Sequence, residues 1–517
     1  MYSPHGKKER ELKYVRAFFI QPKISIMKKS IQTIFACSVF LLTTFQLKAQ
    51  TDADAFRYTG TSITGTARFT SMSGAFGALG GDFSSLSTNP AGIGIYRSSE
   101  ITFTPSVFTA NTKSSFLGNK TSENKFNFNI GNAGIVLTNK LRKDEGTDGW
   151  KSWSFGFGYN RQDNYHTYSV FEGKNTDNSM LDYFAEKAGN QNFADLNNFY
   201  EYLAYYTFLI NPDNDTATTQ YFPAITEYGQ TQRMTKESRG SKGETVFSFG
   251  GNFNNKLYLG ATMGITSLNY SEESTYEELT NSNVIDTLKS YAFQQNLTTD
   301  GNGINIKFGL SYRPTDFFRF GLAIHSPTWY TMHDDYKNYM DSKFIGGHSY
   351  SQESLDGSFD YEMTTPFKAM GSFGFVFGTF GILGADYEMT DYSSTRFNSS
   401  TNSFFDVNKT IQAKYDVAHT FRIGTEWKYE NISFRGGFSY TTSPIKSTYT
   451  TSGSDYSKIG YSAGIGMKEK NFFLDLGYLY TQSNQYFQPY TLSTESVPGV
   501  KNDVSTHNFT ITCGVKF

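Results

Sequence analysis

The chain has 517 residues, a formal net charge of −2 and two cysteines. This charge balance argues against a nucleic-acid-binding surface, and the cysteine count excludes a disulfide framework and a cysteine-based metal site. Aromatic residues reach 17% and charged residues only 18%, which is unusual for a soluble enzyme and typical of a protein that shows aromatic side chains to a lipid interface.

The N-terminal region is interpreted as lying outside the folded protein. Residues 1–26 are read as an over-extended start, and residues 27–49 as a secretory signal peptide with two lysines before an apolar region at 31–45. Cleavage is expected before Gln50. A membrane anchor is the alternative, but the apolar run is short for a membrane-crossing helix. The mature chain has no run of about 18 apolar residues, which excludes a helical membrane protein.

Residues 50–99 contain the stretch SMSGAFGALGGDFSSLSTNPAGIG, which is small, rich in glycine and nearly uncharged. It has neither a GK[ST] motif nor a βαβ context, which excludes a phosphate-binding loop. Glycines let backbone pack closely against backbone, and a proline restricts the residue before it. The segment is therefore predicted to be a compact insert, whose characteristic residues are the glycines Gly74, Gly77, Gly80 and Gly81 and the motif Asn89, Pro90, Ala91 and Gly92.

Strict alternation of apolar and polar residues recurs from residue 100 to the end of the chain. Such alternation gives a strand one apolar face and one polar face. The polar faces carry several charges, which must point inward because a charged side chain in hydrocarbon is costly. Fourteen segments show the pattern, at residues 101–107, 126–130, 153–159, 247–253, 257–265, 304–312, 318–324, 367–377, 383–389, 421–429, 432–440, 459–467, 472–480 and 509–517.

The connections alternate between short turns and long polar insertions, the largest at about residues 161–242. Periplasmic turns and extracellular loops alternate in this way in outer-membrane barrels. We therefore predict an all-β protein, a transmembrane antiparallel β-barrel of about 14 strands over residues 100–517, in the outer membrane of a Gram-negative bacterium. An open pore of that width would leak, so residues 50–99 are predicted to form an N-terminal hatch, or plug, inside the barrel. The final residue, Phe517, resembles the signal read by the barrel-assembly machinery.

The large insertion contains the sequence FADLNNFYEYLAYYTFLINP, which has a helical period. One helical face would carry Phe193, Leu196, Tyr200, Leu203 and Ala204, and Pro212 would end the helix. Such a helix could serve as a docking surface for a hydrophobic ligand, or its face could pack against neighbouring loops and the barrel rim.

The segment GTARFTSMSGAFGALGGDFSSLSTNPAGIGIYRSSEITFTPSV resembles the N-terminal region of the FadL-type (FadL/TodX-like) outer-membrane transporters of long-chain fatty acids and other hydrophobic compounds. In that family an Asn-Pro-Ala motif lies in an N-terminal hatch inside a fourteen-stranded barrel. The sequence-level likeness covers about residues 60–107. The branch is often labelled haemin receptor, a label that no ligating residue here supports. The residues that carry the likeness are Ala67-Arg68, the glycines from Gly74 to Gly81, Asp82 and Asn89-Pro90-Ala91-Gly92.

The resemblance implies passive uptake of a hydrophobic small molecule, which leaves sideways through a gap in the barrel wall into the outer-membrane lipid. By analogy the gap lies near an irregular third strand. There Gly156 and Gly158 could weaken the ladder or, equally, make room for the hatch. The carboxylate of a fatty acid would need an inward cation, for which Arg319, Arg422 and Arg435 are candidates.

The chain lacks a recognisable catalytic constellation, since its histidines show no HExxH spacing and no GxSxG motif is present. We therefore expect no enzymatic activity, no catalytic residues, no cofactor, no metal site and no nucleic-acid partner. The expected partners are a hydrophobic ligand, outer-membrane lipid and, through Phe517, the barrel-assembly machinery. Two alternatives are a binding or shuttle protein of a secretion system and a barrel lipase.

Overall fold

The alternating segments form the wall of a closed barrel, because alternation gives each strand one face for lipid and one for the lumen. Over the described residues the wall has fourteen antiparallel members, three of which are built from more than one strand. Eleven members are single strands: β1 (Glu100–Phe116), β2 (Asn119–Lys140), β7 (Thr231–Phe253), β8 (Leu257–Leu279), β9 (Leu288–Tyr312), β15 (Gly381–Asp391), β17 (Val417–Tyr429), β18 (Ile432–Thr441), β19 (Lys458–Glu469), β20 (Phe472–Phe487) and β21 (Val500–Lys516). The third member combines β3 (Trp150–Asn164) and β4 (Thr167–Lys174), and the seventh combines β10 (Phe318–His325) and β11 (Trp329–Phe344). The eighth combines β12 (Ser349–Glu353), β13 (Gly357–Thr364) and β14 (Lys368–Phe377).

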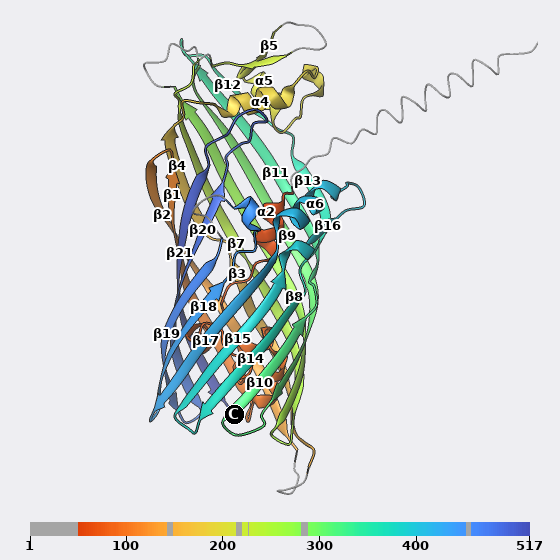
Figure 1. Cartoon of the computed structure of the whole chain (residues 1–517), viewed down its shortest axis with the longest axis vertical. Coiled ribbons are helices and arrows are strands. Elements are labelled where there is room, and N and C mark those ends of the chain that lie inside the picture. Colours follow the sequence, from red (N-terminus) through yellow and green to blue (C-terminus); the bar gives the residue numbers. More distant parts are fainter. Residues whose placement is uncertain (1–49, 142–147, 214–219, 226, 281–287, 451–455) are drawn as a thin grey trace, which may run out of the picture. The chain divides into compact units, whose positions relative to one another are not determined.

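The computed structural model describes residues 50–141, 148–213, 220–225, 227–280, 288–450 and 456–517. The predicted start and signal peptide, residues 1–49, lie outside the described residues. Strand β1 pairs with β2 along one edge and with β21 along the other, so the sheet closes on itself (Figure 1). The predicted β-barrel with about 14 strands is confirmed.

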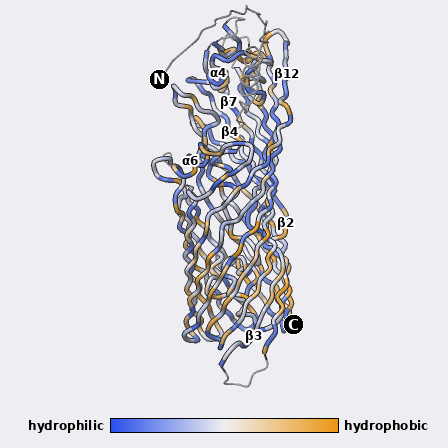
Figure 2. The backbone as a smooth tube through the Cα atoms, turned by 90° about the vertical axis from the view of Figure 1, so that its right-hand side faces the viewer, coloured by the Kyte–Doolittle hydropathy of each residue, from blue (hydrophilic) through white to orange (hydrophobic). Residues whose placement is uncertain are grey.

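Hydrophobic residues gather in the lower half of the barrel in the view of Figure 2, and many of them are exposed on its outer surface. Phe128, Phe249, Phe308, Phe373 and Phe509 are each more than half exposed there. Strands β7, β8 and β9 have 23, 23 and 25 residues, whereas a tilted strand needs only about 9–11 residues to cross a bilayer. The strands therefore continue well beyond the lipid, on the side away from the short turns.

Residues 50–99 form the hatch, which lies inside the barrel as predicted (Figure 1). It contains α2 (Asp52–Thr59), α3 (Ala67–Ser71), η1 (Phe83–Ser87) and η2 (Pro90–Ile95). Polar side chains start these short helices, as local sequence rules require. Asp82 accepts a hydrogen bond from the Ser84 N–H, and Asn89 accepts one from the Ala91 N–H, with Pro90 at the first helical position.

Both ends of the insertion predicted at 161–242 belong to strands of the barrel wall. Strands β3 and β4 extend to Lys174 and β7 begins at Thr231, so residues 175–230 remain outside the wall. This remaining segment is called the cap. Its described elements are α4 (Met180–Ala188), η3 (Phe193–Asp195), α5 (Glu201–Tyr206), β5 (Ile210–Pro212) and β6 (Tyr221–Pro223).

The long helix predicted within the cap is wrong. Only Glu201–Tyr206 is α-helical, because a turn over residues 197–200 interrupts the helical period, and Pro212 lies in β5. No helix among the described residues is long and apolar enough to cross a membrane. Other loops at the same end hold η4 (Tyr392–Ser394), β16 (Arg396–Asn398), α6 (Phe405–Lys414) and η5 (Ser447–Tyr449).

Candidate functional site

Buried ion pairs fasten the hatch to the wall near the turn end of the barrel. The Arg68 guanidinium donates to both carboxylate oxygens of Glu426, at 2.7 and 3.2 Å. Glu426 also accepts from Arg435 Nε at 2.6 Å, and Arg435 Nη1 donates to Asp475 at 2.7 Å. Glu426, Arg435 and Asp475 are buried and Arg68 is partly exposed, so the buried charges depend on their partners for stability. These ion pairs attach the hatch to the inner side of the barrel wall.

The hatch glycines allow close contact with the wall and within the hatch. The Gly77 N–H donates to Asp386 Oδ2 at 3.0 Å, and a Cβ at Gly77 would overlap the side chain of Ser372. Gly80 has a φ of +58° and lies directly against Gly92. A side chain at Gly77 would therefore push the hatch off the wall, and one at Gly80 would push Gly92 away within the hatch.

The motif Asn89-Pro90-Ala91-Gly92 ties the hatch together and to β9. The Asn89 amide donates to the Gly77 carbonyl at 2.5 Å and to the Leu310 carbonyl at 3.2 Å. The wall accommodates the motif with glycines of its own, because a Cβ at Gly309 would overlap Asn89 Oδ1 and one at Gly260 would overlap the Pro90 carbonyl. The motif is a structural clamp between hatch and wall.

The wall is interrupted between β2 and its neighbour β3–β4. The β2–β3 ladder runs from Lys140↔Ser152 to Asn132↔Asn160 and stops there. Beyond it, no described backbone hydrogen bond joins residues 119–131 to residues 161–174. We call this stretch the seam. The outer face of β2 along the seam bears exposed Phe126, Phe128 and Ile130, so the seam reaches the apolar band of the barrel.

Two bulges at the same height explain where the seam begins. The register of β1 with β2 shifts at Thr104/Pro105, which leaves Gly131 as an extra residue in β2. The register of β3 with β7 shifts between Arg161 and Asp163. A bulge bends a strand and increases its twist. The β2–β3 ladder ends where these two bulges lie.

Side chains bridge the seam where the backbone does not. The Asn164 amide donates to Asn127 Oδ1 at 3.0 Å, and Asn127 Nδ2 lies 3.2 Å from His166 Nε2. Arg161 Nε donates to the Ile130 carbonyl at 3.2 Å. Such bonds can be exchanged one at a time, whereas a strand ladder opens cooperatively.

Hatch residues cover the seam from the inside. The Ser62 N–H donates to the Gln162 carbonyl at 2.9 Å, and Ser62 Oγ donates to Asp163 Oδ1 at 2.6 Å. Thr64 Oγ1 donates to the Arg161 carbonyl. The hatch thereby takes up backbone acceptors that a neighbouring strand would otherwise satisfy. Movement of this segment would uncover the seam.

The ladder of β3 runs unbroken through Gly156 and Gly158, which were expected near a lateral gap. A Cβ at Gly156 would lie 2.9 Å from Leu86 of the hatch, and one at Gly158 would lie 2.7 Å from Phe83. The weakened ladder expected at these glycines is therefore absent. Gly156 and Gly158 make room for the hatch. The β2–β3 ladder ends only at Asn160, further towards the cap end of the same strand.

The three arginines proposed for a ligand carboxylate have different surroundings. Arg435 binds Glu426 and Asp475, and Arg422 donates to Glu388 at 2.8 Å. Arg319 instead donates to the Leu79 carbonyl of the hatch at 3.2 Å and has no carboxylate partner among the described residues.

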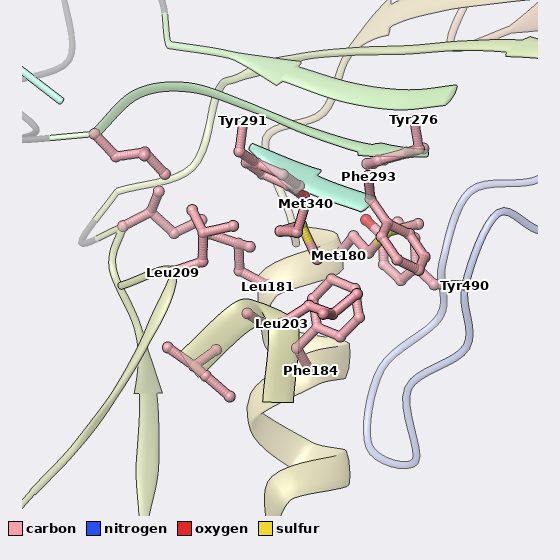
Figure 3. Packing of buried hydrophobic residues seen from close by; sticks show 14 of the residues in the cluster. Met180, Leu181, Phe184, Leu203, Leu209, Tyr276, Tyr291, Phe293, Met340 and Tyr490 are labelled. Atoms are coloured by element: carbon pink, nitrogen blue, oxygen red, sulfur yellow. The ribbon is translucent and has the colours of Figure 1, made fainter. Parts of the chain in front are cut away.

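The cap has a hydrophobic core, part of which Figure 3 shows. The cap lies at the end of the barrel away from the short turns (Figure 1). Leu203 and Phe184 are fully buried, and Phe184 packs edge to face on Phe293 with ring centroids 5.4 Å apart. Of the predicted apolar face, Leu196 and Leu203 pack into this core, whereas Phe193 is 47% exposed. Most of the face is therefore not an open docking surface. Beside this core lies a hollow of about 350 Å³ whose lining includes the acidic residues Asp182 and Glu186, which does not suit a hydrophobic ligand.

One buried carboxylate anchors the cap. Glu278 accepts hydrogen bonds from Ser179 Oγ at 2.6 Å, the Met180 N–H at 3.1 Å and the hydroxyl of Tyr276 at 2.8 Å. Burial raises the pKa of Glu278 above its usual range. Neither α4 nor this anchor was predicted from the sequence. The sequence signal for α4 is the serine-capped run SMLDYFAEKA, in which Ser179 and Asp182 form a capping box.

The family model described as "Outer membrane protein transport protein (OMPP1/FadL/TodX)" matches residues 244–517. Among solved structures, the Pseudomonas putida toluene transporter TodX aligns with 88% of this chain and 99% of its own, at 13% identity and a TM-score of 0.50. A Pseudomonas aeruginosa FadL homologue gives the same coverages and TM-score at 11% identity. At these identities the two structures indicate a shared fold only. No curated protein matches the chain.

Proposed function

Because the chain belongs to the OMPP1/FadL/TodX family of outer membrane transport proteins, we propose that it takes up hydrophobic small molecules passively. Long-chain fatty acids are one class of cargo, and toluene, for which TodX is named a transporter, represents another. Of the three arginines considered for an acidic cargo, Arg319 is the one without an acidic partner among the described residues, so an acidic ligand would bind there.

The observation that carries the proposal is the seam between β2 and β3–β4, backed by hatch residues and open to the apolar band. A hydrophobic molecule in the lumen would leave through the seam directly into lipid, without crossing bulk water. Opening the seam means exchanging side-chain hydrogen bonds that contribute only about 0.5–1.5 kcal/mol each. The hatch segment around Ser62 and Thr64 would have to withdraw at the same time.

Locking the seam tests this route. In a Cys513→Ser background, Asn127→Cys and Asn164→Cys place two thiols across the seam, where the native side chains are 3.0 Å apart. A short, reducible thiol cross-linker should then abolish uptake of radiolabelled oleate or toluene by cells that lack other such transporters. Reduction should restore uptake.

The matched control joins the same two strands where their ladder is already closed. Thr138 and Ser154 are directly opposite, with hydroxyl oxygens 3.0 Å apart. Cross-linking Thr138→Cys to Ser154→Cys should leave uptake unchanged. Uptake that persists with the seam locked would contradict the proposed exit.

A further inference from the structure

Positive charge is concentrated at the end of the barrel that carries the short turns, where the C-terminus lies (Figure 1). We call the turn residues and the strand ends beside them the turn rim: residues 97–100, 139–141, 148–151, 254–256, 313–317, 378–380, 428–431, 467–471 and 516–517. Several strands that run down to the turn rim end in or beside a cation, namely β2 at Lys140, β9 before Arg313, β17 with Lys428, β19 with Lys468 and β21 at Lys516. The whole chain has a formal net charge of −2, so its composition does not explain this concentration.

Much of this positive charge is not neutralised within the protein. Arg313 pairs with Asp316 at 2.8 Å, and Lys516 pairs with Glu100 at 3.0 Å. Five further cations are exposed and form no ion pair with any described residue, while three carboxylates of the turn rim remain to face them. The five cations are Arg97, Lys140, Lys256, Lys468 and Lys470, and the three carboxylates are Asp148, Glu430 and Glu469. The turn rim therefore presents a net positive surface.

Aromatic side chains place the turn rim at the edge of the lipid. Phe317, Phe380, Tyr429 and Phe517 are each at least half exposed there. Exposed aromatic residues collect where the hydrocarbon of a membrane gives way to its head groups. Since the short turns of outer-membrane barrels face the periplasm, the cations of the turn rim lie among the head groups of the periplasmic leaflet.

Three lysines gather on neighbouring hairpins of the turn rim. The Lys468 N–H donates to the carbonyl of Asn431 at 2.9 Å, which joins the hairpin of Lys468 and Lys470 to that of Lys428. The Lys428 side chain is 53% exposed and lies 3.9 Å from Glu426, whose charge two arginines already match. A lysine stem can extend along apolar surface and carry its ammonium group into the head-group layer.

We propose that the turn rim binds anionic phospholipids of the phosphatidylglycerol type in the periplasmic leaflet of the outer membrane. The turn rim continues the apolar band of the barrel, so a lipid whose chains pack on the band brings its phosphate to the lysines. A zwitterionic lipid carries an ammonium group of its own, which these lysines would repel, whereas an anionic lipid does not. The inference does not depend on what the barrel transports.

Quenching of tryptophan fluorescence by brominated lipids tests the proposal. The mature chain is reconstituted in phosphatidylcholine bilayers with Trp427 as its only tryptophan, in a Trp150→Phe/Trp153→Phe/Trp329→Phe background. Trp427 precedes Lys428 and is 44% exposed. Brominated phosphatidylglycerol should quench it more strongly than the same fraction of brominated phosphatidylcholine. The two association constants should differ by about fivefold, the preference that one Lys or Arg near an anionic surface confers.

Removing the three lysines should remove this preference. In the same background, Lys428→Gln/Lys468→Gln/Lys470→Gln should make the two association constants equal, because the charge that distinguishes the lipids is gone. Concentrated salt should weaken the preference of the unsubstituted turn rim, since ions screen exposed charges. Heat-modifiable mobility in gels checks that the variant contains a folded barrel.

The matched control removes the same number of charges from the opposite end of the barrel. Lys113, Lys120 and Lys343 are exposed near the cap ends of β1, β2 and β11. Lys113→Gln/Lys120→Gln/Lys343→Gln should keep the full preference for phosphatidylglycerol.

Three results would overturn the proposal. Equal association constants for the unsubstituted turn rim would mean that its cations face a water-soluble polyanion of the periplasm instead of lipid. A preference that survives loss of the three turn-rim lysines would place the anionic lipid elsewhere. A preference that both sets of substitutions lower equally would reflect the net charge of the chain rather than the turn rim.

Discussion

At the residue scale, the hatch packs closely on the wall because glycines on each side leave room for atoms of the other. Gly260 and Gly309 leave room for Pro90 and Asn89, while Gly77 fits over Ser372. Backbone atoms can then approach closely enough for direct hydrogen bonds. The glycine run of residues 74–81 is therefore one half of a packed interface.

Asp334 is a buried carboxyl group whose charged form is destabilised by the loss of water around it. It lies beyond the lipid band on β11, where the neighbouring outward residues His333 and Asp335 are polar and exposed. It accepts from Gln50 Nε2 at 2.7 Å and from the Tyr361 hydroxyl at 3.2 Å. Burial raises the pKa of the Asp334 carboxyl to about 6.

This pKa predicts a pH dependence of stability. The folded state holds the Asp334 proton more tightly than the unfolded chain, whose pKa is about 4. Stability should therefore fall as the pH rises from about 4 to about 6, by up to about 3 kcal/mol. Asp334→Asn should flatten this part of the profile and raise the thermal midpoint at pH 8, measured by loss of heat-modifiable mobility in gels.

The exposed neighbour provides the control, and Asp335→Asn should reproduce the wild-type profile. A wild-type stability that rises between pH 4 and 6, or an Asp334→Asn protein less stable at pH 8, would contradict the assignment.

At the element scale, the seam shows how a wall can be closed by side chains alone. Strand β3 pairs with β7 from Trp150 to Asn164, with two bulges, but loses its ladder with β2 beyond Asn160. The β2 edge there lies beside β4 without a ladder, and side chains such as Asn119 and Asn127 bridge the two strands. Such cover keeps the edge from pairing elsewhere.

The cap is a separate element with its own core, so it can be loosened without unfolding the barrel. Phe184→Ala removes a fully buried ring, a change that typically costs about 3–5 kcal/mol in a packed core. We expect much faster protease cleavage within residues 175–230 and an unchanged heat-modifiable barrel. Phe193 is 47% exposed, so Phe193→Ala should leave cleavage slow; equal cleavage of the two variants would show that the cap core does not hold the cap.

At the scale of the whole molecule, two barriers close the lumen, the hatch towards the turn end and the cap at the other. A barrel of about fourteen strands is wider than its inward side chains can fill. The hatch fills the remaining space in one half, and the cap core covers the other end.

Removing the hatch should therefore open the channel to ions. We expect deletion of residues 50–95 in a Phe184→Ala background to give a larger single-channel conductance in planar bilayers than Phe184→Ala alone, because both barriers are then weakened. Equal conductances, from preparations that contain the same heat-modifiable barrel, would mean that the hatch is not a plug.

The sequence by itself determined the barrel, because which side of a strand faces lipid depends on each residue's own polarity. The alternation at residues such as 257–265 and 509–517 therefore located strands correctly. The glycine run likewise pointed to close backbone packing. The predicted helix over residues 193–212 was wrong, since a turn over residues 197–200 interrupts the helical period.

Only the tertiary structure decided where the wall opens and which charges are free. The seam depends on two bulges, at Gly131 and after Arg161, that meet at one height, and strand register is a property of pairs of strands. Similarly, Arg319, Arg422 and Arg435 look alike in the sequence, and they differ only because Glu388, Glu426 and Asp475 lie beside two of them. The availability of a buried polar group depends on its neighbours across the lumen, and those neighbours are distant in the chain.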